Sequence, residues 1–183
     1  MVQVGSFWID AFEATIEGEL GHSDQGANFP DGSTLARARS LRDVVPTLRV
    51  SWYQAVAACA NAGKHLCTVT EWHDACGSGT FPWGEAPRSD EVCAIIREDG
   101  TTDWDAVQPT GSLPDCRGPA GVFDQIGNAW EWADPGGHDG IPTTAKVGGA
   151  FYAGAGSGSC VAEPFDGHPP DFDGTIAARC CAD

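Results

Sequence analysis

The spacing of hydrophobic and polar residues changes several times along the chain. Each change predicts the start of a new strand, helix or loop. Between residues 4 and 15 they alternate imperfectly, which predicts a first strand around Phe7 and Ile9. Residues 18–45 are rich in Gly, Asp, Ser and Pro and have little periodicity. We therefore expect one strand followed by a long irregular loop in this part of the chain.

Two short helices are predicted next, because each begins with a capping box. Ser51 followed by Gln54 begins the first helix, and Gly63 ends it. Thr68 followed by Glu71 begins the second, which a glycine also follows. Apolar residues recur on one face of the first helix, so this face is expected to be buried.

The rest of the chain predicts loops with a few strands. Residues 78–120 are interrupted by Pro and Gly, which favours long loops with isolated short strands. A core strand is expected at 130–132, and another at 146–152 after a glycine turn. The adjacent cysteines 180 and 181 predict that the C-terminus is tied down as a strand.

The central stretch of the chain combines two large apolar anchors with a carboxylate. Trp130 and Trp132 demand burial, and Glu131 between them points to the opposite face of an extended segment. A carboxylate that is buried beside aromatic side chains needs a hydrogen-bond donor or a cation as its partner. Calcium is a suitable cation, because it prefers oxygen ligands. The predicted calcium ligands are two carboxylates and two main-chain carbonyls, from Asp124, Glu131, Gly127 and Ala129. The alternative is a turn and core strand in which Glu131 accepts from backbone N–H groups.

Composition narrows the class of protein. The 183 residues suit one domain, and 24 glycines with 12 prolines indicate a loop-rich fold. A formal charge of −16 argues against nucleic acid and anionic membranes as partners, because like charges repel. There is no apolar run long enough to cross a membrane and no signal peptide. A signal for export would then be encoded upstream, or the domain belongs to a larger protein. The domain is expected to be a monomer or a part of such a larger polypeptide.

Eight cysteines are many for a cytosolic domain of this size. They show no CxxC pair and no zinc-ligand spacing with histidine. An even number in an acidic, loop-rich chain favours disulfides formed in an oxidising compartment. We therefore expect an extracellular, cell-surface or periplasmic location.

The order of short motifs over nearly the whole chain resembles the sulfatase-modifying factor family, which has the fold of formylglycine-generating enzymes. The matching pieces are the segments 7–15 (FWIDAFEAT), 50–55 (VSWYQA), 62–66 (AGKHL), 70–72 (TEW), 81–84 (FPWG), 127–132 (GNAWEW), 148–151 (GGAF) and 178–180 (ARC). The resemblance implies an α+β fold of the C-type-lectin-like type. Such a fold has two helices, small antiparallel sheets and much loop held by calcium and disulfides, here as one domain over residues 1–183.

The resemblance also implies specific sites. The calcium site of the family falls on the same four residues that the local chemistry indicated. A second family calcium site is poorly matched by residues 90–95 with Asp103 or Asp105, and we do not predict it. Two family disulfides carry over, and the remaining cysteines suggest two more, which gives Cys59–Cys180, Cys76–Cys160, Cys67–Cys181 and Cys93–Cys116.

The catalytic position of the family is altered. Formylglycine-generating enzymes use two cysteines just after the Gly-Gly strand, whereas this chain has Ala153 at the first position and no counterpart to the second. Alanine provides neither a thiolate nor a soft metal ligand. We therefore predict no catalytic residue and no formylglycine-generating activity.

Residues 151–178 have an unusual composition. Apart from Glu163, every residue belongs to the set reached by varying the adenines of an asparagine codon. In this respect the segment is similar to the variable regions of diversity-generating retroelement proteins, although divergence of a small-residue loop is the alternative. The resemblance implies a ligand-binding surface for a protein or glycan, formed by Tyr152, Phe165, Asp166, His168, Phe172 and Asp173.

Three functions follow from these observations. The first is a non-catalytic binding domain, such as a receptor or adhesin tip. The second is an enzyme of the family whose chemistry uses other residues, for example a metal-dependent oxidoreductase. The third is a structural domain of a secreted assembly.

Overall fold

Two four-stranded sheets share the C-terminal segment of the chain. The computed structural model describes residues 1–20, 36–85, 90–97, 99–136, 144–153, 157–167 and 174–183. The first sheet has its strands in the order β1 (Val2–Val4), β2 (Phe7–Ile9), β10 (Cys180–Ala182) and β5 (His65–Leu66). Neighbouring strands in this sheet are antiparallel. The C-terminus is therefore tied down as a strand, as the adjacent cysteines 180 and 181 predicted. This strand lies inside the sheet.

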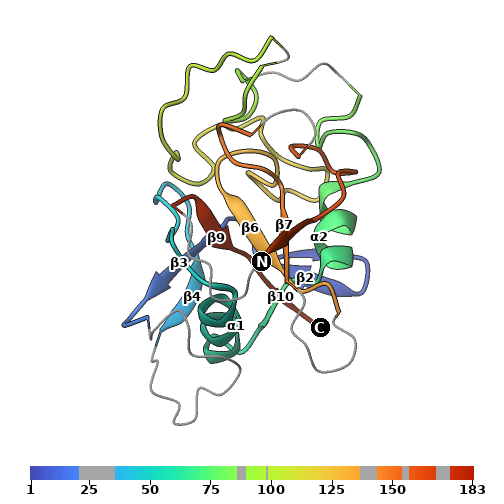
Figure 1. Ribbon diagram of the computed structural model, residues 1–183. Coiled ribbons are helices and arrows are strands. Elements are labelled where there is room, and N and C mark those ends of the chain that lie inside the picture. The colour runs from blue at the N-terminus through green and yellow to red at the C-terminus, as the bar shows by residue number, and fades with distance from the viewer. Residues whose placement is uncertain (21–35, 86–89, 98, 137–143, 154–156, 168–173) are drawn as a thin grey trace.

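The second sheet carries the residues of most functional interest. Its order is β8 (Phe165–Gly167), β7 (Thr144–Val147), β6 (Trp130–Ala133) and β9 (Ile176–Ala178). The β6–β9 pair is parallel and the other two pairs are antiparallel. Since β9 and β10 are separated by a single residue, one short segment belongs to both sheets (Figure 1).

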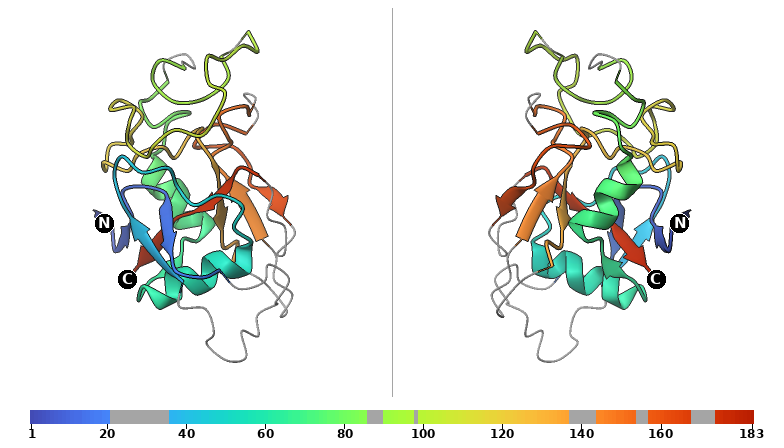
Figure 2. Two further views of the ribbon diagram at one scale, coloured as in Figure 1. Left: turned by 90° about the vertical axis from the view of Figure 1, so that its left-hand side faces the viewer. Right: turned by 90° about the vertical axis from the view of Figure 1, so that its right-hand side faces the viewer.

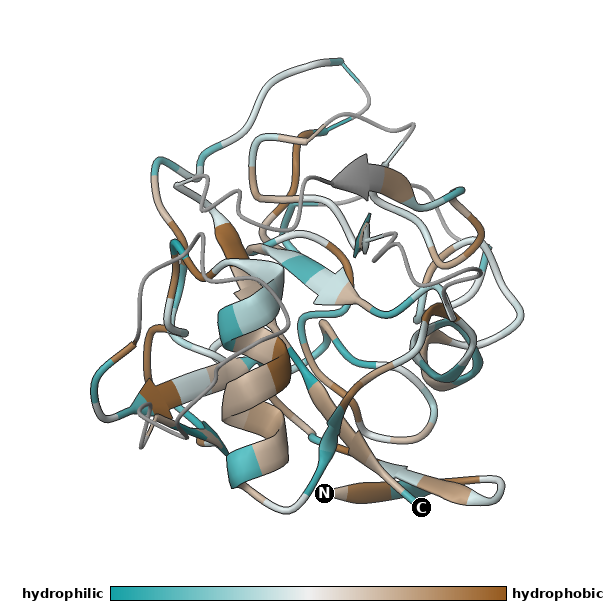
Figure 3. Cartoon of the chain, turned by 60° about the horizontal axis from the view of Figure 1, so that its bottom comes forward, coloured by the Kyte–Doolittle hydropathy of each residue, from teal (hydrophilic) through white to brown (hydrophobic). Residues whose placement is uncertain are grey.

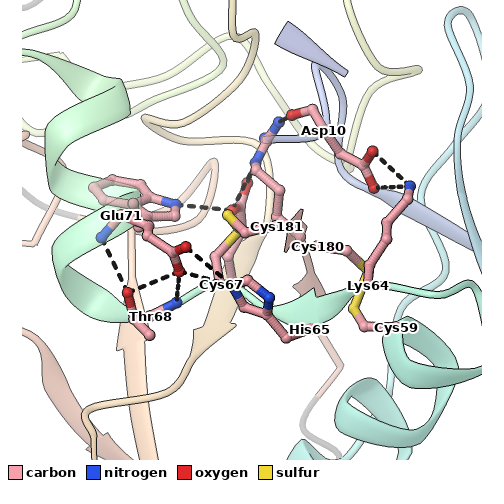
Figure 4. The surroundings of a disulfide bond; sticks show 12 residues. Asp10, Cys59, Lys64, His65, Cys67, Thr68, Glu71, Cys180 and Cys181 are labelled. Carbon is pink, nitrogen blue, oxygen red and sulfur yellow. Dashed lines mark hydrogen bonds and ion pairs between the residues drawn. A yellow bond between two sulfur atoms is a disulfide. The ribbon is translucent and has the colours of Figure 1, made fainter. Parts of the chain in front are cut away.

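Both predicted helices are present, and both capping boxes are formed. Helix α1 spans Trp52–Asn61 and helix α2 spans Val69–Cys76. At α1 the Ser51 hydroxyl accepts from Gln54 N at 3.2 Å, and the Gln54 side chain accepts from Ser51 N at 2.9 Å. The equivalent reciprocal bonds join the residues 68 and 71 at α2, where the glutamate also contacts His65 (Figure 4). Each box satisfies N–H groups that a helix start leaves without partners.

The core has one part under each helix. Helix α1 packs against Trp132 and Ile176 of the second sheet. Its apolar residues lie in its middle, with a polar residue near each end (Figure 3). Helix α2 places Trp72 in a second cluster with Ile126 and Val147. The segment from 90 to 128 consists largely of loops and forms the end of the molecule remote from α1 (Figures 1 and 2).

All four predicted disulfides are present, and they account for all eight cysteines. Adjacent residues of β10 take part in two of them: Cys180 is bonded to Cys59 of α1, and Cys181 to Cys67 (Figure 4). Alternate residues of a strand point to opposite faces, so the two bonds fix β10 from both sides. The disulfide prediction is confirmed.

Two expectations about strands were wrong. The segment predicted as an irregular loop over 18–45 contains β4 (Arg37–Ser40), which pairs with β3 (Ala14–Glu17). The strand expected at 146–152 is instead β7, and it ends at Val147. It ends there because Gly148 and Gly149 both have positive φ angles, +84° and +73°, which turn the chain out of the sheet.

In the described part of the chain, no helix is long and apolar enough to cross a membrane.

Removing the bond between β10 and Cys67 should destabilise the domain. We expect the double variant Cys67→Ser/Cys181→Ser to lose about 2–5 kcal/mol of unfolding free energy, because the bond closes a long loop of the unfolded chain. The measurement is urea unfolding followed by tryptophan fluorescence. As a control, thiol titration of the unfolded, unreduced wild type should find no free thiol. Two or more titratable thiols would contradict the assigned bonds.

Candidate functional site

Four residues from β6, from β8 and from the segments next to β7 and β9 are linked by one ring contact and two hydrogen bonds. Phe165 of β8 packs edge-on against Trp130 of β6, with ring centroids 5.2 Å apart. The Tyr152 hydroxyl lies 2.5 Å from the Thr175 hydroxyl, and Thr175 O accepts from Trp130 N at 2.9 Å. Tyr152 and Phe165 are 45% and 47% exposed. We call these four residues the aromatic face.

The aromatic face contains two of the six predicted ligand-binding residues, Tyr152 and Phe165. Phe165 is exposed and is therefore available for contact with a ligand. Asp166 follows it in β8, opposite Ala145 of β7. The other three, His168, Phe172 and Asp173, lie outside the described residues.

The sequence did not assign Trp130 to this surface, although its position contained a signal. Trp130 is the first residue of β6 and is half-buried, whereas Trp132 is fully buried. Two tryptophans at a spacing of two lie on one face of a strand. The one at the strand end is the one that can extend beyond the core.

The position that corresponds to the first catalytic cysteine of the family is filled by a methyl group. Ala153 is 6% exposed, and its N–H donates to Ala150 O at 2.7 Å. A side-chain carbon on Gly149 would lie only 3.1 Å from the Ala153 methyl, so this turn is closely packed. Every cysteine of the chain is in a disulfide, which leaves no thiol to act as nucleophile or copper ligand.

A buried ion pair lies at the junction of the two four-stranded sheets. Arg179, between β9 and β10, donates from Nη2 to Glu131 Oε1 at 2.6 Å and from Nε to Oε2 at 3.0 Å. Trp72 Nε1 donates to the same carboxylate at 2.8 Å. Neither charged side chain is exposed by more than 1%. The partners of Glu131 are therefore side chains and not the backbone N–H groups considered from the sequence.

Two further carboxylates are buried around this pair. Asp124 Oδ2 accepts from Gly111 N at 2.6 Å. Glu13 accepts from the Asn128 side chain at 2.6 Å and from Ala129 N at 3.2 Å. Burial, with the nearby Asp124 carboxylate as the next cause, raises the pKa of Glu13 well above its ordinary value. Burial likewise raises the pKa of Asp124 to about 6.

The charges in this cluster do not balance when all of its groups are ionised. Three carboxylates, Glu13, Asp124 and Glu131, face the buried guanidinium of Arg179, and the exposed Arg42 acts on Asp124 from the surface. Charges removed from water need compensation, so the surplus must be met by a bound cation or by protonation of a carboxyl group. This imbalance is the property of the structure that suits a calcium ion.

Three of the predicted calcium ligands lie in the bend from residue 124 to 129, and the fourth, Glu131, lies in β6. Gly127 has a φ of +82°, and an added side-chain carbon there would lie 2.1 Å from Ala94 O, so only glycine fits. Within the described ranges, no three His, Cys, Asp or Glu side chains are arranged to hold a metal ion. Calcium would therefore depend on main-chain carbonyls and would share Glu131 with Arg179. The ligand set stays a prediction.

The region of the poorly matched second calcium site is also occupied by an arginine. Arg97 Nε donates to Asp90 Oδ1 at 2.7 Å, and its Nη2 contacts Asp103. Asp90 is buried, and its main-chain oxygen accepts from Trp104 Nε1 at 3.1 Å. A guanidinium thus supplies positive charge between these two carboxylates.

This arrangement of sheets, helices and ordered loops defines a protein of the C-type-lectin-like fold. The solved structure titled Major Tropism Determinant P3c Variant matches the whole chain and 52% of its own length, with a TM-score of 0.58 and 20% identity. Treponema denticola variable protein 1 matches 98% of this chain and 97% of its own, with a TM-score of 0.59 and 15% identity. At such identities these likenesses concern the fold alone.

The family is shown by the sequence match. Residues 1–154 match the model of the sulfatase-modifying factor enzyme 1-like domain, and the chain belongs to this family. The formylglycine-generating enzyme of Mus musculus is 35% identical over 131 residues, 59% of this chain. The inactive Cα-formylglycine-generating enzyme 2 of Bos taurus is 33% identical over 104 residues, 48% of the chain. In both cases the match spans 32% of the relative.

Breaking the buried pair should destabilise the domain far more than breaking an exposed one. We expect Arg179→Met to lower the unfolding free energy by about 3–5 kcal/mol, because it leaves buried carboxylates without their cation. Arg39→Met is the matched control: its pair with Glu17 is more than half exposed and contributes about 0–1 kcal/mol. Urea unfolding measures both.

The double variant Arg179→Met/Glu131→Met gives the coupling between the two side chains. We expect it to lose clearly less stability than the sum of the single variants, because it leaves neither charge of the pair alone. Additive losses would contradict a direct role for this pair.

Proposed function

We propose that this chain is a non-catalytic ligand-binding domain whose ligand contacts come from residues 151–178, and that it is the variable protein of a diversity-generating retroelement. The observation that carries the proposal is the aromatic face. Its two exposed aromatic residues, Tyr152 and Phe165, both come from the segment of asparagine-codon composition, and they are linked through Thr175 and Trp130. Aromatic side chains provide large contact area for little loss of conformational entropy, as binding surfaces require.

The disulfides on either side of residues 161–178 suit a binding surface whose amino-acid sequence varies between copies of the protein. Cys160 and Cys180, on either side of the greater part of the segment, are bonded to Cys76 of α2 and Cys59 of α1. The structural neighbours include one titled a variable protein and several titled as variants of one determinant. A rigid support limits the ordering cost when a loop surface binds its ligand.

Family membership alone does not decide between enzyme and binding protein, because the relatives include active enzymes and an enzyme named as inactive. The local chemistry favours binding. Ala153 and the fully paired cysteines leave this chain without the sulfur groups of the family reaction. Four disulfides also favour a site of action outside the reducing cytosol. The ligand is proposed to be a protein or glycan.

Calcium is part of the proposal, as the ion that balances the buried charge cluster. It would be held by Asp124 and Glu131 with the carbonyl oxygens of Gly127 and Ala129. The support is the surplus of negative charge around Arg179. When bound, the ion would supply positive charge and fix the turn that precedes β6; it has no chemical role in the proposal.

A chelator should therefore lower the melting temperature. At calcium concentrations about 100 times Kd we expect a difference of about 5–10 °C between calcium and EGTA. Asp124→Asn should reduce this difference, whereas Glu17→Gln, which changes an exposed carboxylate, should leave it intact. Equal melting temperatures for wild type in calcium and EGTA would overturn the proposal and assign the charge balance to protonated carboxyl groups.

The variable-protein proposal is tested on the gene. Sequencing the locus in related isolates should show substitutions concentrated in codons 151–178 and confined to adenine positions of a nearby, nearly identical copy. Codons 124–132, which encode the buried turn and β6, are the internal control and should be constant. Substitutions spread evenly over both regions would reject the variable-protein proposal.

The enzyme alternative has its own measurement. A sulfatase-type cysteine peptide incubated with the protein and copper should show no formylglycine by mass spectrometry, with an active member of the family as the positive control. Turnover would reject the non-catalytic assignment.

A further inference from the structure

The basic residues of this acidic chain are concentrated in one region. Of ten lysines and arginines, four occur within thirteen residues that contain one acidic residue, Asp43: they are Arg37, Arg39, Arg42 and Arg49. All four are exposed. The whole chain has a formal charge of −16, so this cluster is a local region of positive potential. Such a region favours the binding of anions.

Two of these arginines line a cavity together with the lysine that precedes β5. The cavity has a volume of about 450 Å³ and lies beside β4. Its cationic side chains are Arg37, Arg39 and Lys64, and its anionic ones are Asp10 and Glu17. It shares no residue with the aromatic face, so its role is separate from the proposed ligand binding.

Arg37 is held in place by the end of α1. Its Nε donates to Asn61 O at 2.8 Å, and the Asn61 side chain donates to Ala36 O at 3.0 Å. These bonds orient the guanidinium without using its terminal nitrogens. Among the residues that the structure describes, no carboxylate lies within ion-pair distance of Arg37.

The other two cations differ in how strongly they are paired. Lys64 Nζ lies 2.7 and 2.8 Å from the two oxygens of buried Asp10, so its charge is compensated within the fold. Arg39 pairs with Glu17 at 3.1 Å, but both side chains are more than half exposed. Exposed pairs of this kind are weak and exchange readily with other ions. Among the lining side chains that the structure describes, three cations face two carboxylates, which gives this lining a net positive charge.

We propose that this cavity is a binding site for an anion bearing phosphate or carboxylate groups, with Arg37 and Arg39 as its principal ligands. The two alternate with buried Ala38 along β4, so they lie on the same face of the strand, roughly 6–7 Å apart along it. Each guanidinium presents a planar fork that matches phosphate and carboxylate oxygens. The spacing suits two carboxylates of an acidic segment, or a phosphate held between the arginines.

Isothermal titration with sodium phosphate, citrate and a hexaglutamate peptide, at constant ionic strength, tests this site. We expect saturable binding of at least one probe. Arg37→Gln and Arg39→Gln should each weaken it at least about tenfold, because each removes charged hydrogen bonds. The matched control is Arg49→Gln, which removes the same charge outside the cavity and should change Kd less than about twofold.

The relative affinities identify the source of the anion. Tighter binding of hexaglutamate indicates an acidic protein segment, and tighter binding of phosphate indicates a phosphorylated group. Arg37→Lys, which keeps the charge but loses the fork, should weaken binding less than Arg37→Gln does. The proposal is overturned if no probe saturates, or if Arg49→Gln weakens binding as much as the cavity variants do. Circular dichroism of each variant separates loss of binding from loss of folding.

Discussion

The contact between Arg179 and Glu131 holds the two four-stranded sheets of the domain together. Arg179 is the single residue between β9 and β10, and its side chain reaches the middle of β6. Its Nη1 also donates to Asp10 O at 2.9 Å, next to β2, and its Nη2 to Phe123 O at 2.8 Å. One guanidinium thus binds three separate parts of the chain. A buried charge tolerates little displacement, because each lost hydrogen bond leaves it uncompensated.

The aromatic face depends on that junction. Thr175 directly precedes β9, and its carbonyl oxygen and hydroxyl bring Trp130 and Tyr152 together. Since β9 is parallel to β6 and continues into β10, the position of Thr175 is set by elements whose side chains are buried. The exposed side chains of the aromatic face and the buried frame are therefore joined through Trp130, which packs against the core. Substitutions at exposed Tyr152 or Phe165 need not disturb the core.

The sequence predicted the elements whose determinants are local. Both capping boxes formed, because the paired side chains are three residues apart and act within one turn. The disulfides followed from the family resemblance, since no spacing rule selects one pairing of eight cysteines. Of the predicted ligand-binding residues, Tyr152 and Phe165 are exposed, and their role in binding stays a prediction.

The remaining features arise from contacts between distant segments. Strand β4 was missed because its sequence, Arg-Ala-Arg-Ser, contains a single small apolar residue, and its partner β3 lies about twenty residues away. The role of Arg179 was missed because nothing in a sequence states which carboxylate an arginine will bind. The unbalanced charge around it has the same origin, since it depends on three carboxylates that meet only in the folded chain.

The bonds of Cys160 and Cys180 to two different helices have a consequence for chain length. Between them, the connection from Gly167 to Ile176 joins β8 and β9, two outer strands of the same sheet. The entropy of closing a loop grows only with the logarithm of its length, so extra residues inserted there would cost little once both attachment points are covalently fixed. By this estimate, doubling the number of residues between the two strands would cost about 0.6 kcal/mol of stability.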